Sequence, residues 1–117
     1  MRMRHICVRG ILSVAALLAL GGGLALAASA EKGKAAFMKA GCYECHGTMG
    51  QGGITGPRIA PEPIPYETLS AFVRSSSRNM PPYREKILSE ADLQDIYAYL
   101  QSIPKPPDIN SIPLLKP

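Results

Sequence analysis

Histidine and cysteine are scarce in this chain. Its 117 residues include two histidines and three cysteines, and one of each lies within the first thirty residues. Beyond residue 30, the histidines and cysteines are Cys42, Cys45 and His46 alone. A structural zinc site needs about four nitrogen or sulfur ligands. The sequence therefore argues against a zinc protein.

An excess of charge is also lacking. The formal net charge is +4, but Arg2, Arg4 and Arg9 contribute three of these charges from the start of the chain. Without them the balance is +1, which gives no argument for binding nucleic acid.

The first thirty residues have the pattern of an export signal. The three arginines precede an apolar run from Ile11 to Ala28, and Ala28, Ser29 and Ala30 fit the small-residue pattern of a cleavage site. We therefore expect residues 1–30 to be a signal peptide that directs the other 87 residues to the periplasm. The apolar run of 18 residues is also close to the minimum for a membrane span. An uncleaved membrane anchor is the alternative.

Two cysteines and a histidine form the most informative motif. Cys42, Cys45 and His46 stand in the pattern Cys-x-x-Cys-His, which is typical of c-type haem attachment. Two thiols at this spacing can form thioethers with the two vinyl groups of the porphyrin, and the adjoining imidazole is then held at the iron. A thioredoxin-like dithiol is an alternative, but it expects a βαβ pattern that this sequence lacks. A structural disulfide is another, but it leaves His46 unexplained.

Helical patterns and loops alternate along residues 31–103, which we expect to form one domain. The expected helices are residues 32–41, 66–75 and 89–102. Glycines and prolines indicate loops at 47–65 and 76–88. The predicted fold class is all-α, with three to four helices around one covalently bound haem. A domain of this size has a small core, and the apolar haem would supply a centre for it.

Met80 is the candidate for the sixth ligand of the iron. Beyond residue 30 the methionines are Met38, Met49 and Met80. Met49 lies only three residues after His46, too near to reach the opposite face of the ring, and Met38 is a candidate for core packing. Met80 lies 34 residues beyond His46, before two prolines that stiffen its segment. Ligation by His46 and Met80 would fill both axial positions, which favours electron transfer over catalysis.

Further contacts of the haem can be proposed from the same pattern. A ligating histidine usually donates its second ring N–H to a carbonyl or carboxylate, and the carbonyl of Pro57 is a candidate acceptor. The haem propionates need donors or cations. The candidates for this role are Arg58, Tyr66, Arg74 and Arg78.

Three motifs resemble those of the class I c-type cytochromes. They are the attachment site at Cys42, Cys45 and His46, the loop Thr55-Gly56-Pro57, and the segment Met80-Pro81. The resemblance implies a small all-α domain wrapped around one haem c. It also implies a one-electron carrier, not an enzyme, with redox proteins as partners: a dehydrogenase or cytochrome complex, and a terminal oxidase or reductase.

The resemblance extends to two helices. Gly33 and Phe37 resemble the contact pair of the family's first helix, and Ile96 and Tyr99 lie in a segment that resembles its last helix. These helices cross at the small residue in that family. The resemblance thus implies that Gly33 and Phe37 contact Ile96 and Tyr99.

Residues 104–117 form a tail outside the resemblance. Prolines alternate with apolar side chains there, which indicates an extended, polyproline-like segment. The tail could pack along its own domain or dock on a partner protein. In the second case the protein would be a dedicated cytochrome subunit of a larger dehydrogenase complex, held by this tail.

Overall fold

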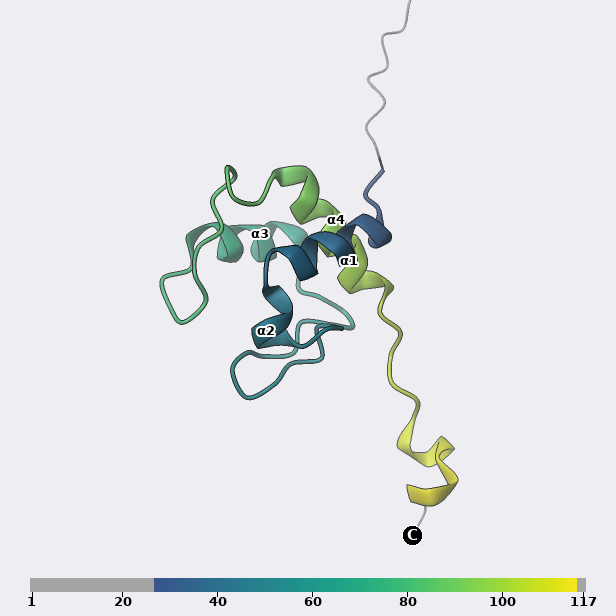
Figure 1. Cartoon of the computed structure of the whole chain (residues 1–117). Helices are drawn as coiled ribbons and strands as arrows, with labels where there is room; N and C mark the ends of the chain where they lie inside the picture. Colours follow the sequence, from purple (N-terminus) through teal and green to yellow (C-terminus); the bar gives the residue numbers. More distant parts are fainter. Residues whose placement is uncertain (1–26, 116–117) are drawn as a thin grey trace, which may run out of the picture.

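The computed structural model describes residues 27–115, and its regular structure is entirely helical (Figure 1). The helices are α1 (Ala30–Lys39), α2 (Cys42–His46), α3 (Tyr66–Ser75), α4 (Glu90–Ser102) and two short 3₁₀ turns, η1 (Ile109–Ser111) and η2 (Pro113–Leu115). Four α-helices and no strand within the described range confirm the all-α prediction. Most of the expected signal peptide, residues 1–26, lies outside the described residues. No helix within 27–115 is long and apolar enough to cross a membrane.

The helix bounds follow from local capping. The bounds of α3 match the prediction, and α4 begins directly after Ser89, whose hydroxyl accepts the N–H of Asp92 at 3.1 Å. Helix α1 begins two residues earlier than predicted because Ser29 caps it, accepting the N–H of Lys32 at 3.3 Å. Gly41 ends this segment with a left-handed φ of 76°, which glycine adopts without strain.

Helix α2 was not predicted as a separate element. It contains the Cys-x-x-Cys-His motif and spans only five residues. A helix this short shows no periodicity in the sequence, so a pattern of apolar residues could not reveal it.

Helices α1 and α4 cross in close contact, as the resemblance implies. A Cβ atom on Gly33 would lie 1.8 Å from the carbonyl oxygen of Asp95, so only glycine fits at the crossing. The rings of Phe37 and Tyr99 pack with their centroids 5.7 Å apart. Phe37, Ile96 and Tyr99 are all buried, and this contact forms the core beside the candidate site.

The glycine-rich segment between α2 and α3 is held by its own hydrogen bonds. The N–H of Gly52 donates to the carbonyl of His46 at 2.8 Å, and the N–H groups of Ile59 and Ala60 donate to that of Gly50 at 2.8 and 2.9 Å. The hydroxyl of Tyr99 donates to the carbonyl of Thr48 at 2.8 Å. These bonds fix the loop against both α2 and α4.

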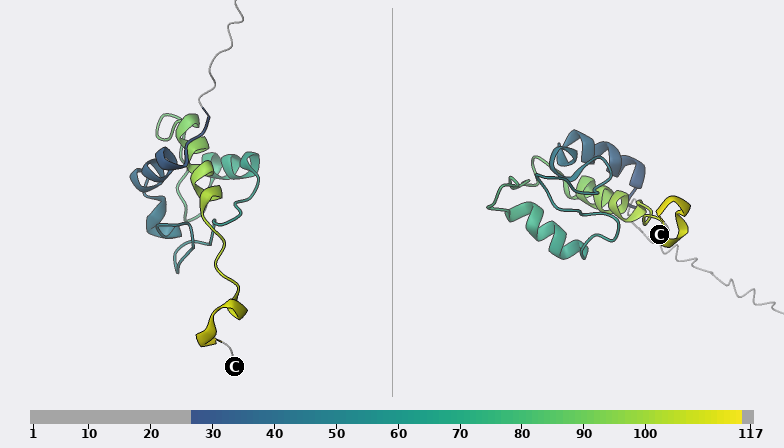
Figure 2. Two further views of the ribbon diagram at one scale, coloured as in Figure 1. Left: turned by 90° about the vertical axis from the view of Figure 1, so that its right-hand side faces the viewer. Right: turned by 90° about the horizontal axis from the view of Figure 1, so that it is seen from below.

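The tail extends away from the helical domain (Figures 1 and 2). Lys105 forms an ion pair with Glu62, with 2.6 Å between Nζ and Oε1, and both side chains are exposed. Further along, Ile109, Leu114 and Leu115 are exposed. Apart from this ion pair, residues 104–115 of the tail are therefore not packed along their own domain in this structure.

Candidate haem site

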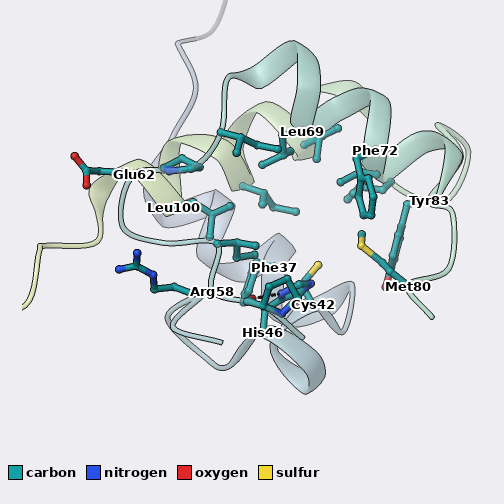
Figure 3. Close-up of a pocket in the computed structure, with 18 of the residues that line it drawn as sticks. Phe37, Cys42, His46, Arg58, Glu62, Leu69, Phe72, Met80, Tyr83 and Leu100 are labelled. Atoms are coloured by element: carbon teal, nitrogen blue, oxygen red, sulfur yellow. Dashed lines mark hydrogen bonds between the residues drawn. The ribbon is translucent and has the colours of Figure 1, made fainter. Parts of the chain in front are cut away.

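One apolar cavity of about 360 Å³ lies between the helices, within the size range of pockets that hold small organic ligands. Its walls include the buried side chains of Phe37, Leu69, Leu88, Leu93, Ile96 and Leu100. Cys42 and His46 of α2 line it, and Met80 enters it from the segment after α3 (Figure 3). Three chemical groups that the sequence analysis singles out for haem therefore meet at one cavity.

The imidazole of His46 is oriented by the loop that follows α2. Its Nδ1 lies 2.8 Å from the carbonyl oxygen of Pro57, the contact expected from the sequence. With Nδ1 as the donor, Nε2 is the ring nitrogen left to bind a metal. The loop can approach this closely because Gly56 has no side chain. A Cβ atom there would lie 2.7 Å from the carbonyl oxygen of Cys45.

The two cysteines are free thiols in this structure. Burial raises the pKa of the Cys42 thiol to about 11, an effect that a backbone hydrogen bond partly offsets and the nearby Cys45 adds to. Cys42 is therefore neutral at pH 7. Residues 27–115 contain no strand, so they lack the βαβ pattern that a thioredoxin-like dithiol expects. Within residues 27–115, no three or more His, Cys, Asp or Glu side chains gather as a metal site of their own.

Tyr83 is a site residue that the sequence analysis missed. Its ring lines the cavity three residues after Met80, and its hydroxyl donates to the carbonyl of Ala40 at 2.9 Å. Its backbone N–H donates to the carbonyl of Val73 at 2.8 Å. Burial is the main cause that raises the pKa of Tyr83, so the hydroxyl remains a donor at neutral pH. Because both acceptors are backbone carbonyls, no side-chain motif could have revealed these contacts.

The four residues proposed to bind the haem propionates differ in whether they line the cavity. Arg58 lines the cavity, whereas Tyr66, Arg74 and Arg78 are not among the residues that do so. The hydroxyl of Tyr66 donates to a carboxylate oxygen of Glu90. Burial, with this hydrogen bond as the next cause, raises the pKa of Tyr66 to about 12. Arg58 is thus the candidate best placed for a propionate, a role that stays a prediction.

Like Tyr66, Arg74 makes its hydrogen bonds with other parts of the protein. One nitrogen of its guanidinium, Nη1, donates to the carbonyls of Tyr83 and Leu88 at 2.9 and 2.5 Å. The other, Nη2, lies 2.9 Å from Glu90 Oε2 in an ion pair. The side chain therefore joins α3 to the segment that follows Met80 and to α4.

The residues present fit a haem group. The cavity offers apolar walls to the porphyrin, the thiol of Cys42 on its wall, and an imidazole nitrogen and a thioether for the iron. Cys45 belongs to the same short helix but is exposed and does not line the cavity. Donors of this kind are those that c-type haem attachment uses.

Comparison with protein families agrees with this chemistry. The chain matches the family model described as cytochrome c oxidase, cbb3-type, subunit III over residues 28–100. No curated protein and no solved structure matches it. The matched range contains Cys42, Cys45, His46 and Met80, and it covers more than half of the chain. The chain therefore belongs to this family of c-type cytochrome domains.

Proposed function

We propose that this protein is a one-electron carrier with a single haem c, attached through Cys42 and Cys45. Membership of a c-type cytochrome family supports electron transfer in preference to catalysis. The observation that carries the proposal is the placement of Cys42, His46 and Met80 around one apolar cavity. In this proposal the signal peptide directs the protein to the periplasm, where it passes electrons between other redox proteins.

The roles of the residues follow from their chemistry. The haem supplies the one-electron couple of its iron. Cys42 and Cys45 hold the porphyrin, and His46 presents Nε2 while Pro57 fixes its ring. Met80 presents a soft thioether, which raises the reduction potential relative to a harder ligand. The buried apolar walls exclude water and lower the local dielectric, which also tunes the potential.

A ligand-binding test separates a carrier from an enzyme or a gas sensor. If both axial positions are filled by side chains, carbon monoxide added to the reduced protein at pH 7 should leave its absorption spectrum unchanged over several minutes. Rapid binding would show an open position at the iron. That outcome would overturn the proposal of a simple carrier.

The tail supports a second candidate function. Ile109, Leu114 and Leu115 are exposed on a segment that extends away from the domain. Such an apolar segment is suited to docking, and the family description itself names a subunit of an oxidase. The protein could accordingly be a dedicated cytochrome subunit of a larger redox complex, such as a dehydrogenase, held by the tail.

Truncation after Ile103 tests this second candidate. The shortened protein should keep its haem spectrum and its thermal unfolding midpoint, because residues 104–115 contribute nothing to the buried core. If the tail docks on a partner complex, co-purification with that complex from the native cells should be lost. A full-length variant with Leu114 and Leu115 changed to serine tests whether the apolar side chains are responsible. Undiminished association of both variants would refute docking through the tail.

A further inference from the structure

Met80 lies on a segment with few contacts of its own. Residues 76–89 connect α3 to α4, and the described hydrogen bonds include none made by residues 77–82. Most side chains in 77–82 are exposed, while Met80 is half-buried at the cavity. The position of the Met80 sulfur is therefore set mainly by the two ends of this stretch, Ser76 at the end of α3 and Tyr83.

The Tyr83 end is held by the last turn of α3. The N–H of Tyr83 donates to the carbonyl of Val73, and the neighbouring Arg74 donates from Nη1 to the carbonyls of both Tyr83 and Leu88. Residues 84–88 form a turn between these two carbonyls, closed by hydrogen bonds from Ile87 and Leu88 to Arg84. One guanidinium group thus ties both ends of this turn to α3.

Glu90 fixes the orientation of this guanidinium. Its Oε2 lies 2.9 Å from Nη2 of Arg74, and its other oxygen accepts from the hydroxyl of Tyr66. The Arg74 side chain is only 20% exposed, so its hydrogen bonds are shielded from water more than those of a surface pair. Glu90 also begins α4, where the helix dipole favours a negative charge. Three elements consequently meet at Arg74: α3, α4 and the segment that carries Met80.

We propose that Arg74 is a positioning residue that holds the Met80 segment in the conformation in which its thioether faces His46 across the cavity. The proposal rests on ligation by Met80, as proposed above. The role requires arginine, because a planar guanidinium can donate to two carbonyls and a carboxylate at once, whereas the single ammonium group of lysine lacks this fork geometry. Loss of these bonds should free residues 77–88 without removing any atom from the cavity wall.

The test compares Arg74→Lys and Arg74→Gln with Arg84→Gln. Arg84 lies in the same segment, is exposed and makes no described side-chain hydrogen bond, so its change controls for the loss of one charge. In the oxidised protein, imidazole added from solution should replace Met80 about ten times faster in both Arg74 variants, because a segment that opens more often exposes the iron. In Arg84→Gln the rate should stay within about twofold of wild type.

Hydrogen exchange supplies a second readout. The amides of Ile87 and Leu88 should exchange faster in Arg74→Lys than in Arg84→Gln, while amides in the middle of α4 keep their protection. Arg74→Lys keeps the charge, and it serves as the main variant if Arg74→Gln does not fold.

The possible outcomes distinguish a failure of the positioning role of Arg74 from a failure of the proposed ligation by Met80. A wild-type protein without thioether ligation in its spectrum would contradict the proposed function itself. A wild type with that ligation, together with Arg74 variants that bind imidazole no faster than Arg84→Gln, would overturn the positioning role. The same conclusion would follow if Arg74→Lys lowered only the global unfolding midpoint and left the exchange of Ile87 and Leu88 unchanged.

Discussion

Met80→Ala is expected to abolish the sulfur-to-iron absorption band at the red end of the oxidised spectrum. It should also lower the reduction potential, on the order of 0.2 V, a fraction of the about 0.8 V range over which axial ligands set haem potentials. The physical reason is the loss of a soft ligand that favours ferrous iron. The measurements are an absorption spectrum and a redox titration of the purified variant.

Met49→Ala is the matched control for this change. Met49 is about half exposed and does not line the cavity, so its removal deletes the same side chain without touching the site. Its spectrum and potential should match those of wild type. If Met80→Ala retained the band, Met80 would lose its assigned role.

Gly33→Ala is expected to destabilise the domain by about 3 kcal/mol, which lowers the unfolding midpoint by more than about 10 °C. The added Cβ would lie 1.8 Å from the carbonyl oxygen of Asp95, which is backbone and cannot rotate away. Helices α1 and α4 would have to separate, and the contact between Phe37 and Tyr99 would loosen. Thermal unfolding followed by circular dichroism measures the effect.

Gly53→Ala makes the same chemical change where space permits it. A Cβ atom on Gly53 would lie 3.7 Å from the nearest atom, the carbonyl oxygen of Cys45, which is an ordinary contact. Gly53 is exposed, so the unfolding midpoint of the Gly53→Ala variant should stay within a few degrees of wild type. Equal midpoints for the two alanine variants would show that the close helix crossing does not determine stability.

The parts of the structure that the sequence could predict are those with local causes. The bounds of α3 and the start of α4 depend on residues a few positions apart. The resemblance to class I c-type cytochromes also implied the contact of Gly33 and Phe37 with α4, because that contact is shared by proteins with these motifs.

The parts that escaped prediction depend on contacts between distant residues. The N–H of Ser29, the residue that caps α1, donates to Asp95 at 2.6 Å, a contact across 66 positions. Arg74 was a propionate candidate, yet its partners are two carbonyls and Glu90. Backbone carbonyls are present at every position, so no spacing of residue types shows which carbonyls will accept a hydrogen bond from a given side chain.

The residues of the candidate site also divide into those placed by local sequence and those placed by contacts between distant segments. The two cysteines and His46 are adjacent in the sequence and form one short helix, so their proximity is a local property. Met80 could be proposed by elimination, since few residues of suitable chemistry are available. Tyr83 could not be proposed, because its hydrogen bonds to Ala40 and Val73 arise only when α1, α3 and the Met80 segment come together.

Every role proposed for this cavity requires that one haem is covalently attached to the polypeptide. The decisive experiment is an intact mass measured under denaturing conditions, on protein purified from the periplasm of cells that attach haem c. We expect a single species with the mass of the exported polypeptide plus one haem. The mass of the polypeptide alone, with any haem released on denaturation, would show that no haem is attached and would refute the proposed function.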